Sequence, residues 1–403
     1  MRFKFLPGNQ VTLLNSGAEY FPALLADLDQ ASREIFLESY IFANDEIGHE
    51  VTSALCRAAE RGVRVRVTVD GFGSRNFATD FLPRLTEAGV QAMLYRPELG
   101  TFRLRRHRLR RLHRKLVVID GRIAYIGGIN IVDDNNAPED MRPRYDYSVC
   151  LRGPAISQVH HAVRRMWEIV AWANFKRRFR LAAVDAPCCD IAGKQQAAFL
   201  IRDNIRHRND ILNAYLAAIH QAQDEILIAN AYFLPGVRFG RALQAAARRG
   251  VRITILLQGK TDHPLLRFAT QALYAAAFKE GMRIFEYEKS FMHAKVAVID
   301  GDWATVGSSN IDPFSLLLAK EANLVVRDRD FAHQLRHSLH QAMADGAREM
   351  KAADFVAQPL HTRFLRWLSY AAVRLMVGLT GYGPKHWQAD EETPGTIPEV
   401  PTE

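Results

Sequence analysis

One pattern of eight residues, His-x-Lys-x-x-x-x-Asp, occurs twice in this chain of 403 residues. The first copy is HRKLVVID at 113–120, and the second is HAKVAVID at 293–300. Two other blocks repeat in the same order, EIFLESYIF (34–42) with EILIANAYF (225–233), and AAERGVRVRVTVD (58–70) with AAARRGVRITILLQ (245–258). Similar blocks in one order indicate that the chain contains an internal duplication, which limits the folds it can adopt.

The duplication predicts two similar lobes. We place the first at 8–180 and the second at 198–350, with 181–197 as the connection between them. Each lobe alternates strand and helix signals: in the first, the apolar run 35–42 and the alternating run 63–70 flank a helical stretch that ends near Gly62. This order favours an α/β fold with a mixed, largely parallel sheet flanked by helices.

The repeated pattern itself predicts a strand with two functional side chains on one face. Residues two apart in a strand point the same way, so His113 projects with Lys115, and His293 with Lys295. Each copy ends in Asp-Gly, at Asp120 and Asp300, and Asp-Gly between apolar runs favours a tight hairpin.

Two-residue turns at these Asp-Gly pairs would fix what lies opposite each histidine. His113 would face Gly128, and His293 would face Ser308. Small residues at these places would let a bulky anion approach the backbone. Two residues further on, Asn130 and Asn310 can donate hydrogen bonds.

A histidine and a lysine beside such donors suit phosphodiester chemistry. Lysine holds a phosphate oxygen as a compact positive charge, and histidine attacks phosphorus or carries a proton near neutral pH. A phosphodiester exchange needs one group to attack and another to protonate the leaving alcohol. Two His-Lys sets that face each other between lobes would supply both, which explains why one chain carries two copies.

The doubled pattern, with Gly-Gly-x-Asn and Gly-Ser-x-Asn downstream, resembles the phospholipase D superfamily across both lobes. The resemblance implies lobes packed about a pseudo-twofold axis, one active site between them, a phosphohistidine intermediate, and neither metal nor other cofactor. It also implies three groups of site residues. The catalytic set is His113, Lys115, Asp120, His293, Lys295 and Asp300. The phosphate-binding residues are Gly128, Asn130, Ser308 and Asn310, and the acids that orient the histidines are Asp146 and Glu321. The two aspartates of the pattern would support the hairpins rather than the chemistry.

Sequence does not decide which histidine attacks, and we favour His113. The superfamily includes nucleases, phospholipases and phospholipid synthases, so the fold leaves the substrate open. A net charge of +9 favours an anionic partner without choosing between lipid and nucleic acid. The basic run 103–115 and the stretch NFKRRFR (174–180) suit either partner.

The segment after the second lobe favours lipid. On a helix within 355–383, Arg363, Arg366, Tyr370 and Arg374 would share one face, and apolar residues would cover much of the rest, so the segment predicts a membrane-associating helix. The stretch 384–403 is rich in proline and acid and predicts a disordered tail. The N-terminus has no apolar signal-peptide region, and no apolar run is long enough for a transmembrane helix.

A closer resemblance, carried by HRKLVVIDGRIAYIGGIN, VTLLNSGAEYFPALLADL and RGVRVRVTVDGFGS, is to bacterial phospholipid synthases of the superfamily. It implies transfer of a phosphatidyl group from phosphatidylglycerol to a second lipid alcohol, with cardiolipin as product. The alternative is a hydrolytic phospholipase D or nuclease-type phosphodiesterase with the same residues. We expect a peripheral protein of the bacterial cell membrane, at its cytoplasmic face, with anionic phospholipids rather than nucleic acid as partners. The sequence indicates neither the acceptor lipid nor the oligomeric state.

Overall fold

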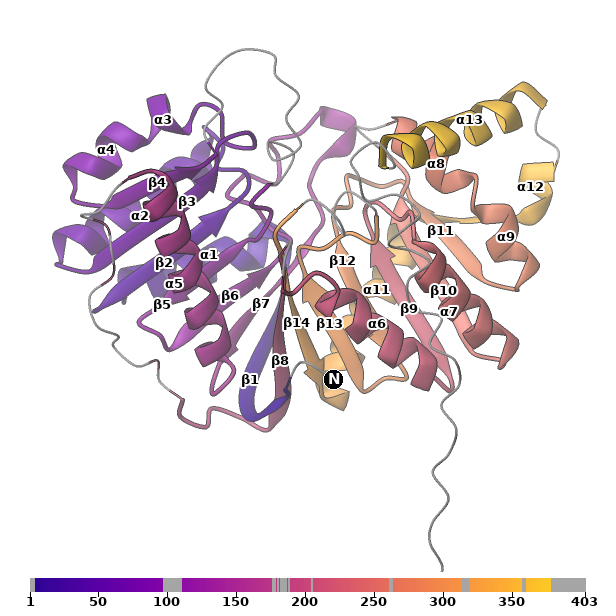
Figure 1. Ribbon diagram of the computed structural model, residues 1–403, viewed down its shortest axis with the longest axis horizontal. Helices are drawn as coiled ribbons and strands as arrows, with labels where there is room; N and C mark the ends of the chain where they lie inside the picture. Colours follow the sequence, from indigo (N-terminus) through magenta and orange to yellow (C-terminus); the bar gives the residue numbers. More distant parts are fainter. Residues whose placement is uncertain are drawn as a thin grey trace, which may run out of the picture.

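The fold was analysed in a computed structural model (Figure 1). It describes residues 4–96, 111–175, 179, 181, 187, 189–203, 206–260, 264–312, 319–356 and 360–377. Two lobes of similar construction lie side by side, the first in indigo to magenta and the second in dark pink to yellow.

The first lobe consists of β1 (Leu6–Asn15), α1 (Ser16–Asp29), β2 (Glu34–Ser39), α2 (Glu46–Glu60), β3 (Arg64–Asp70), α3 (Phe77–Asp80), α4 (Leu82–Glu87), β4 (Gln91–Tyr95), β5 (Leu116–Ile119), β6 (Ile123–Gly127), the 3-10 turn η2 (Glu139–Met141), β7 (Tyr147–Arg152) and α5 (Ile156–Ala173).

The second lobe consists of β8 (Gln195–Arg202), α6 (Asp210–Gln221), β9 (Glu225–Asn230), α7 (Val237–Arg248), β10 (Arg252–Gln258), α8 (Pro264–Gln271), α9 (Tyr274–Lys279), β11 (Arg283–Tyr287), β12 (Lys295–Ile299), β13 (Trp303–Gly307), β14 (Glu321–Arg327) and α11 (Arg329–Gly346), followed by β15 (Ala347–Met350), α12 (Ala352–Val356) and α13 (Leu360–Val377). The first residues of β8 fall within the stretch 181–197 that we expected to be the connection.

The strands form one sheet whose order repeats outward from its centre. The order is β15-β11-β10-β9-β12-β13-β14-β8-β1-β7-β6-β5-β2-β3-β4, and the antiparallel pair of β1 and β8 joins the two lobes. From that pair outward, both lobes use equivalent strands in the same sequence, as expected for a duplicated chain.

The predicted α/β class and the mixed sheet are confirmed, but the prediction of a largely parallel sheet is wrong. Only β2, β3 and β4, and likewise β9, β10 and β11, pair in parallel. The other described pairs are antiparallel. The reason is that each repeat adds an Asp-Gly hairpin and its neighbouring strand, and hairpins create antiparallel pairs.

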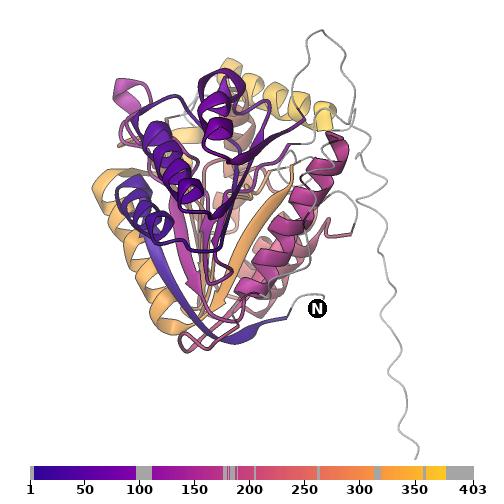
Figure 2. The ribbon, with the colours of Figure 1, turned by 90° about the vertical axis from the view of Figure 1, so that its left-hand side faces the viewer.

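Apolar cores hold the sheet between its helices. One lies under α1 and α2 of the first lobe, and another under α6 and α7 of the second. The largest joins the inner faces of both lobes through α5 and α11. This shared core explains how the two lobes are held in a fixed relation. Figure 2 shows α5 and α11 on opposite sides of the sheet's centre.

The hairpins of the repeated pattern differ from the prediction by one residue. In the first, Ile119 pairs with Ile123 and Leu116 with Ile126, so the extension of the ladder would bring Ile129, and not Gly128, opposite His113. The second hairpin has the same register, with Ile299 paired with Trp303. The Asp-Gly turns do form, with positive φ at both residues, but one extra residue is accommodated beside each turn and shifts the pairing.

The segment after the second lobe forms the helix α13, and one arginine of its predicted basic face packs against the protein. Arg366 of α13 is buried: its Nε donates to Oε1 of Gln271 in α8 at 3.1 Å, and its guanidinium lies 4.4 Å from the ring centre of Phe355. At Arg366 the predicted basic face therefore packs against the second lobe, where it meets the side chain of Gln271 in α8. The side chains of Arg363 and Arg374, and the whole of 384–403, lie outside the described residues.

Candidate active site between the lobes

Backbone hydrogen bonds connect each repeated pattern to the other lobe. The N–H of His113 donates to the carbonyl oxygen of Lys320 at 3.0 Å, and the N–H of His293 donates to that of Tyr145 at 2.7 Å. The N–H of Lys320 donates in return to the carbonyl oxygen of Arg111, and the N–H of Tyr145 to that of Phe291, so each pattern forms a short parallel bridge with the other lobe. Both histidines therefore lie at the junction of the lobes, as two related halves of one site.

Each histidine is held by a carboxylate from the opposite lobe. Nδ1 of His113 lies 3.0 Å from both carboxylate oxygens of Glu321, the first residue of β14. Nδ1 of His293 lies 2.8 Å from Oδ2 of Asp146, just before β7. The two acids are buried, whereas the histidine side chains stay 15% and 18% exposed. Since Nδ1 is occupied in both rings, Nε2 is the atom left for chemistry.

The two lysines are buried beside the histidines. Nζ of Lys115 donates to the carbonyl oxygen of His113 at 2.7 Å. Nζ of Lys295 lies 2.7 Å from Nδ1 of His293 and 3.4 Å from Oδ2 of Asp146. Lys295 thus contacts a carboxylate directly, and Lys115 feels the charge of Glu321. A bound phosphodiester would add the negative charge that allows one histidine to hold a proton.

Burial and neighbouring charges shift the pKa values of the two histidines, of Lys115 and of Asp146. Burial lowers the pKa of His113, and burial together with Lys295 lowers that of His293 to about 3. The pKa of Lys115 falls to about 7, chiefly through burial and then through the charge of Lys295. Burial alone would raise the pKa of Asp146, but Lys295 and His293 outweigh it and lower that pKa. A cluster of shifted values in a partly open site is typical of catalytic centres.

The aspartates of the pattern lie at the far ends of their strands from the histidines. The carboxylate of Asp120 accepts hydrogen bonds from the backbone N–H groups of Ser32, Arg33 and Glu34. Asp300 accepts equivalent bonds from 223–225. Both therefore fix the hairpin to the start of the neighbouring strand, and neither is near the histidines.

The small residues after each hairpin contact the carboxylates. A Cβ atom at Gly128 would lie 2.3 Å from Oδ1 of Asp146, so only glycine leaves room for that acid. In the second lobe, Oγ of Ser308 donates to Oε2 of Glu321 at 2.5 Å. Our prediction that these positions lie directly opposite the histidines was wrong by one residue, because of the shifted register.

The two asparagines are buried beside the site. Oδ1 of Asn130 accepts a hydrogen bond from the N–H of Ile41 at 3.1 Å, which leaves its Nδ2 group to donate. Oδ1 of Asn310 has no hydrogen-bond partner within the described part of the chain. The carbonyl oxygen of the Asn310 amide thus keeps unused hydrogen-bonding capacity.

Sequence reasoning missed two aromatic residues in the site. The ring of Tyr40 packs edge-on against His113 with centroids 4.8 Å apart, and Nζ of Lys115 lies 5.3 Å from its centre. The ring of Phe291 stacks on His293 at 5.8 Å. Tyr40 has Ala231 as its counterpart in the second repeat, so comparison of the two copies gave no signal for it. Phe291 lies two residues before the second pattern and could have been found by its proximity.

The two basic stretches that the sequence analysis singled out are described only in part. Most of the run 103–115 falls outside the described residues, as does most of 174–180. Among the residues that the structure does describe, no group of three or more metal-ligating side chains occurs, and no helix is both long and apolar enough to cross a membrane.

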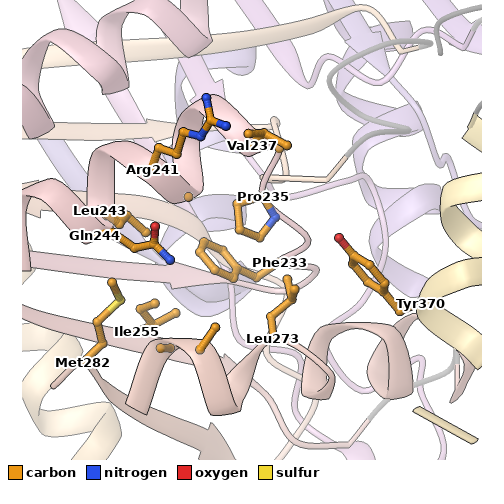
Figure 3. A pocket seen from close by; sticks show the side chains of 14 residues that line it. Phe233, Pro235, Val237, Arg241, Leu243, Gln244, Ile255, Leu273, Met282 and Tyr370 are labelled. Atoms are coloured by element: carbon orange, nitrogen blue, oxygen red, sulfur yellow. The ribbon is translucent and has the colours of Figure 1, made fainter. Parts of the chain in front are cut away.

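A separate cavity of about 310 Å³ lies in the second lobe (Figure 3). Its lining comes from α7, α9 and α13 and is mostly apolar, with Phe233, Leu273 and Met282 inside and Arg241 and Tyr370 around them. Phe233 forms a bridge with Ile311, next to Asn310. The cavity contains neither histidine, but through Phe233 it adjoins the segment that follows the second hairpin.

Comparison with known proteins agrees with this geometry. A family model described as the PLD-like domain of cardiolipin synthase matches residues 24–167 and 215–343, more than half of the chain. The chain is 37% identical over 396 residues to cardiolipin synthase B of Shigella flexneri and to that of Escherichia coli K12, covering 96% of this chain and 93% of each relative. It is 30% identical over 368 residues to the major cardiolipin synthase ClsA of Bacillus subtilis, covering 89% of this chain and 74% of that protein.

Solved structures support the same fold. The crystal structure of phosphatidylserine synthase from Haemophilus influenzae matches with a TM-score of 0.69 at 14% identity, over 94% of this chain and 97% of that one. Polyphosphate kinase from Porphyromonas gingivalis matches with a TM-score of 0.56 at 15% identity, over 92% of this chain and 53% of that one. The duplicated pattern, the shared site and the matches over nearly the whole sequence lead to one conclusion: this chain belongs to the cardiolipin synthase family of phospholipase D-like proteins.

Proposed function

We propose that the chain is a cardiolipin synthase-type phosphatidyltransferase that moves a phosphatidyl group from phosphatidylglycerol to the hydroxyl of a second phospholipid. The supporting observation is the pair of histidines whose Nδ1 atoms are each held by a carboxylate of the other lobe. This arrangement leaves two Nε2 atoms for the two proton and phosphorus transfers that such an exchange requires. The relatives named cardiolipin synthase support the same substrate class.

In the first step, Nε2 of His113 attacks the phosphorus of phosphatidylglycerol. A P–N bond forms and the P–O bond to glycerol breaks. His293, which holds a proton once the negative phosphodiester is bound beside it, gives its Nε2 proton to the departing glycerol oxygen. In the second step, the now neutral His293 removes the proton from the hydroxyl of the incoming lipid, whose oxygen attacks the phosphorus. The P–N bond breaks, the product leaves, and both histidines regain their starting protonation states.

Two observations favour His113 as the nucleophile. Glu321 approaches its ring with both oxygens, and among the described residues no lysine forms an ion pair with it, so the positive charge of a phosphohistidine would face its full negative charge. At His293, Asp146 is shared with the Lys295 ammonium, which opposes positive charge on the ring and makes the protonated form a stronger acid. Lys115 and Lys295 would hold the non-bridging phosphate oxygens, with Asn130 and Asn310 as further donors.

We also propose that the protein acts on lipids at the surface of the bacterial cell membrane, as a peripheral protein of its cytoplasmic face. A lipid acceptor has to compete with water, so a bilayer surface that delivers the acceptor and limits water favours transfer over hydrolysis.

The decisive experiment follows the lipids formed from phosphatidylglycerol vesicles by mass spectrometry. Cardiolipin together with free glycerol is the expected result. Phosphatidic acid without cardiolipin would identify a hydrolytic phospholipase D instead. Unchanged lipid together with cleavage of DNA or RNA would overturn the lipid assignment. The variant with both His113→Ala and His293→Ala serves as the control for contaminating activity.

A further inference from the structure

Large apolar side chains are exposed at two places far apart in the sequence. On α13, Leu365, Trp367, Leu368 and Leu375 are between 45% and 65% exposed. At the C-terminal end of α5, Trp172 is 74% exposed and Phe175, just beyond the helix, is 92% exposed. Side chains of this size at such exposure are unusual for a surface in contact with water alone.

The end of α5 lies at the edge of the sheet that holds the site. His113 precedes β5, and β2, β3 and β4 run antiparallel to β5, so their C-terminal ends lie at the edge where His113 is found. The side-chain amide of Asn174 donates to the carbonyl oxygen of Leu94, near the end of β4, at 3.4 Å. This bond places Trp172 and Phe175 at the site edge of the first lobe.

The helix α13 lies at the same edge on the second lobe. It packs on α8 through Arg366 and Gln271, and α8 follows the C-terminal end of β10. That end lies beside Asn230, which pairs with Lys295 at the start of β12. Figures 1 and 2 both show α13 and the C-terminal end of α5 at the upper end of the molecule.

Cations stand between these two apolar places, at the mouth of the site. Phe72 follows β3 and is 37% exposed, and the guanidinium groups of Arg75 and Arg111 each lie 4.5 Å from its ring centre. Arg111 is two residues from His113. The site edge therefore combines arginines near the histidines with apolar side chains further out, which matches the anionic headgroups and the acyl layer of a phospholipid surface.

We propose that the site edge of the sheet is the face by which this protein docks on an anionic bilayer, with α13 of the second lobe and the end of α5 of the first as two apolar contacts on either side of the site mouth. The proposal rests on the proposed function, since a lipid substrate explains why the apolar contacts share an edge with the histidines. Docking through both lobes would bring the site mouth to the headgroup layer, so that a lipid needs to move only a short way to reach His113.

The apolar face of α13, and not its arginine face, would enter the lipid. Arg366 is occupied against Phe355 and Gln271, and Val373 is fully buried, so the helix has one face on the protein and the other free. Tryptophan is well suited to the interface between headgroups and acyl chains. Each of the two apolar contacts carries one, Trp367 on α13 and Trp172 on α5.

The test compares vesicle binding of three variants of the full chain. One carries Trp367→Gln, Leu368→Gln and Leu375→Gln on α13, and another carries Trp172→Gln and Phe175→Gln. The matched control is Ile191→Gln: this side chain is 81% exposed but lies at the opposite edge, against Gly8 at the start of β1. Co-sedimentation with phosphatidylglycerol vesicles is measured for each, together with turnover of short-chain, monomeric phosphatidylglycerol.

Both site-edge variants should bind vesicles at least about tenfold more weakly, because each loses about 1.4 kcal/mol or more of apolar transfer free energy. The control should bind like the unaltered protein, and all three should turn over monomeric substrate normally. Unchanged vesicle binding by both site-edge variants would overturn the proposal, and weaker binding by only one would overturn the two-lobe contact. If the unaltered protein binds vesicles but makes no cardiolipin, the proposed function fails while the docking face stands.

Discussion

Glu321 of the second lobe holds Nδ1 of His113 of the first lobe with both carboxylate oxygens at 3.0 Å. Asp146 of the first lobe holds His293 of the second in the same crossed manner. Neither lobe therefore contains a complete histidine-acid pair of its own. The orientation of each histidine therefore depends on the other lobe.

The first prediction concerns the crossed acid. Glu321→Gln removes the negative charge that faces the His113 ring while it keeps the size of the side chain. We expect kcat to fall by roughly 10²- to 10⁴-fold, because the phosphohistidine cation loses its counter-charge. Steady-state turnover of phosphatidylglycerol measures this, and the rate of phosphoenzyme formation should fall by a similar factor. The control is Glu349→Gln, which alters an exposed pair with Arg283. A fall in kcat of less than threefold would contradict the assigned role.

The second prediction concerns pH. His113 has to be neutral to attack, and its pKa is lowered from 6.5, so activity should be lost on the acid side only below pH 6.5. The pKa of Lys115 is lowered to about 7, so the free enzyme loses this positive charge as the pH rises through about 7. If the charge holds phosphate, kcat/KM for monomeric substrate should fall above that pH.

Bound phosphate would raise the pKa of Lys115, so kcat at saturation should stay constant to higher pH than kcat/KM does. Lys115→Arg tests the assignment, since a guanidinium stays charged throughout this range. The fall in kcat/KM near pH 7 should disappear in any activity that this variant retains. An unchanged alkaline fall would mean that a different group titrates.

The third prediction separates the two histidines. His293→Ala should still form a phosphatidyl-histidine from a donor whose leaving group is p-nitrophenol, because that group departs without a proton. His113→Ala should form none. Intact-protein mass spectrometry after an alkaline quench would detect the added phosphatidyl group. A mass increase in His113→Ala and its absence in His293→Ala would reverse our assignment.

The repeat and the positions of His113 and His293 at a lobe interface could be predicted because they depend on local pattern and duplication. The strand period places His113 and Lys115 on one face, and three repeated blocks require two similar lobes. Asp146 and Glu321 could be nominated only through the resemblance to the phospholipase D superfamily, from their similar places after each pattern. Which histidine each acid contacts could not be predicted. That pairing depends on how β7 and β14 meet at the junction of the lobes, which sequence spacing does not determine.

The prediction of the hairpin register failed, and the packed face of α13 was not predicted, for different physical reasons. An Asp-Gly pair favours a tight turn but does not exclude an extra residue beside it, and one residue moves Gly128 away from the place opposite His113. For α13, the sequence predicts an amphipathic helix but not which face packs on the protein, where Arg366 finds buried partners in Gln271 and Phe355. An amphipathic helix has two usable faces, and tertiary contacts decide which one packs.

The last prediction concerns a buried ion pair that only one lobe carries. Arg114, next to His113, donates to both carboxylate oxygens of Glu38 at 2.8 and 2.7 Å, and both side chains are almost fully buried. In the second repeat the same positions hold Ala294 and Ala229, so the fold tolerates the absence of the pair there.

Arg114→Ala should lower the free energy of unfolding by roughly 3–5 kcal/mol, because it leaves Glu38 buried without its partner. The double variant Arg114→Ala with Glu38→Ala should recover part of that loss, since it copies the pair of alanines in the second lobe and removes the stranded charge. Recovery should be incomplete, because the two small side chains leave unfilled space. Urea denaturation of the single and double variants measures this, with the exposed pair Arg348 and Glu288 as the matched control. A double variant less stable than Arg114→Ala would show that Glu38 contributes to stability independently of its ion pair.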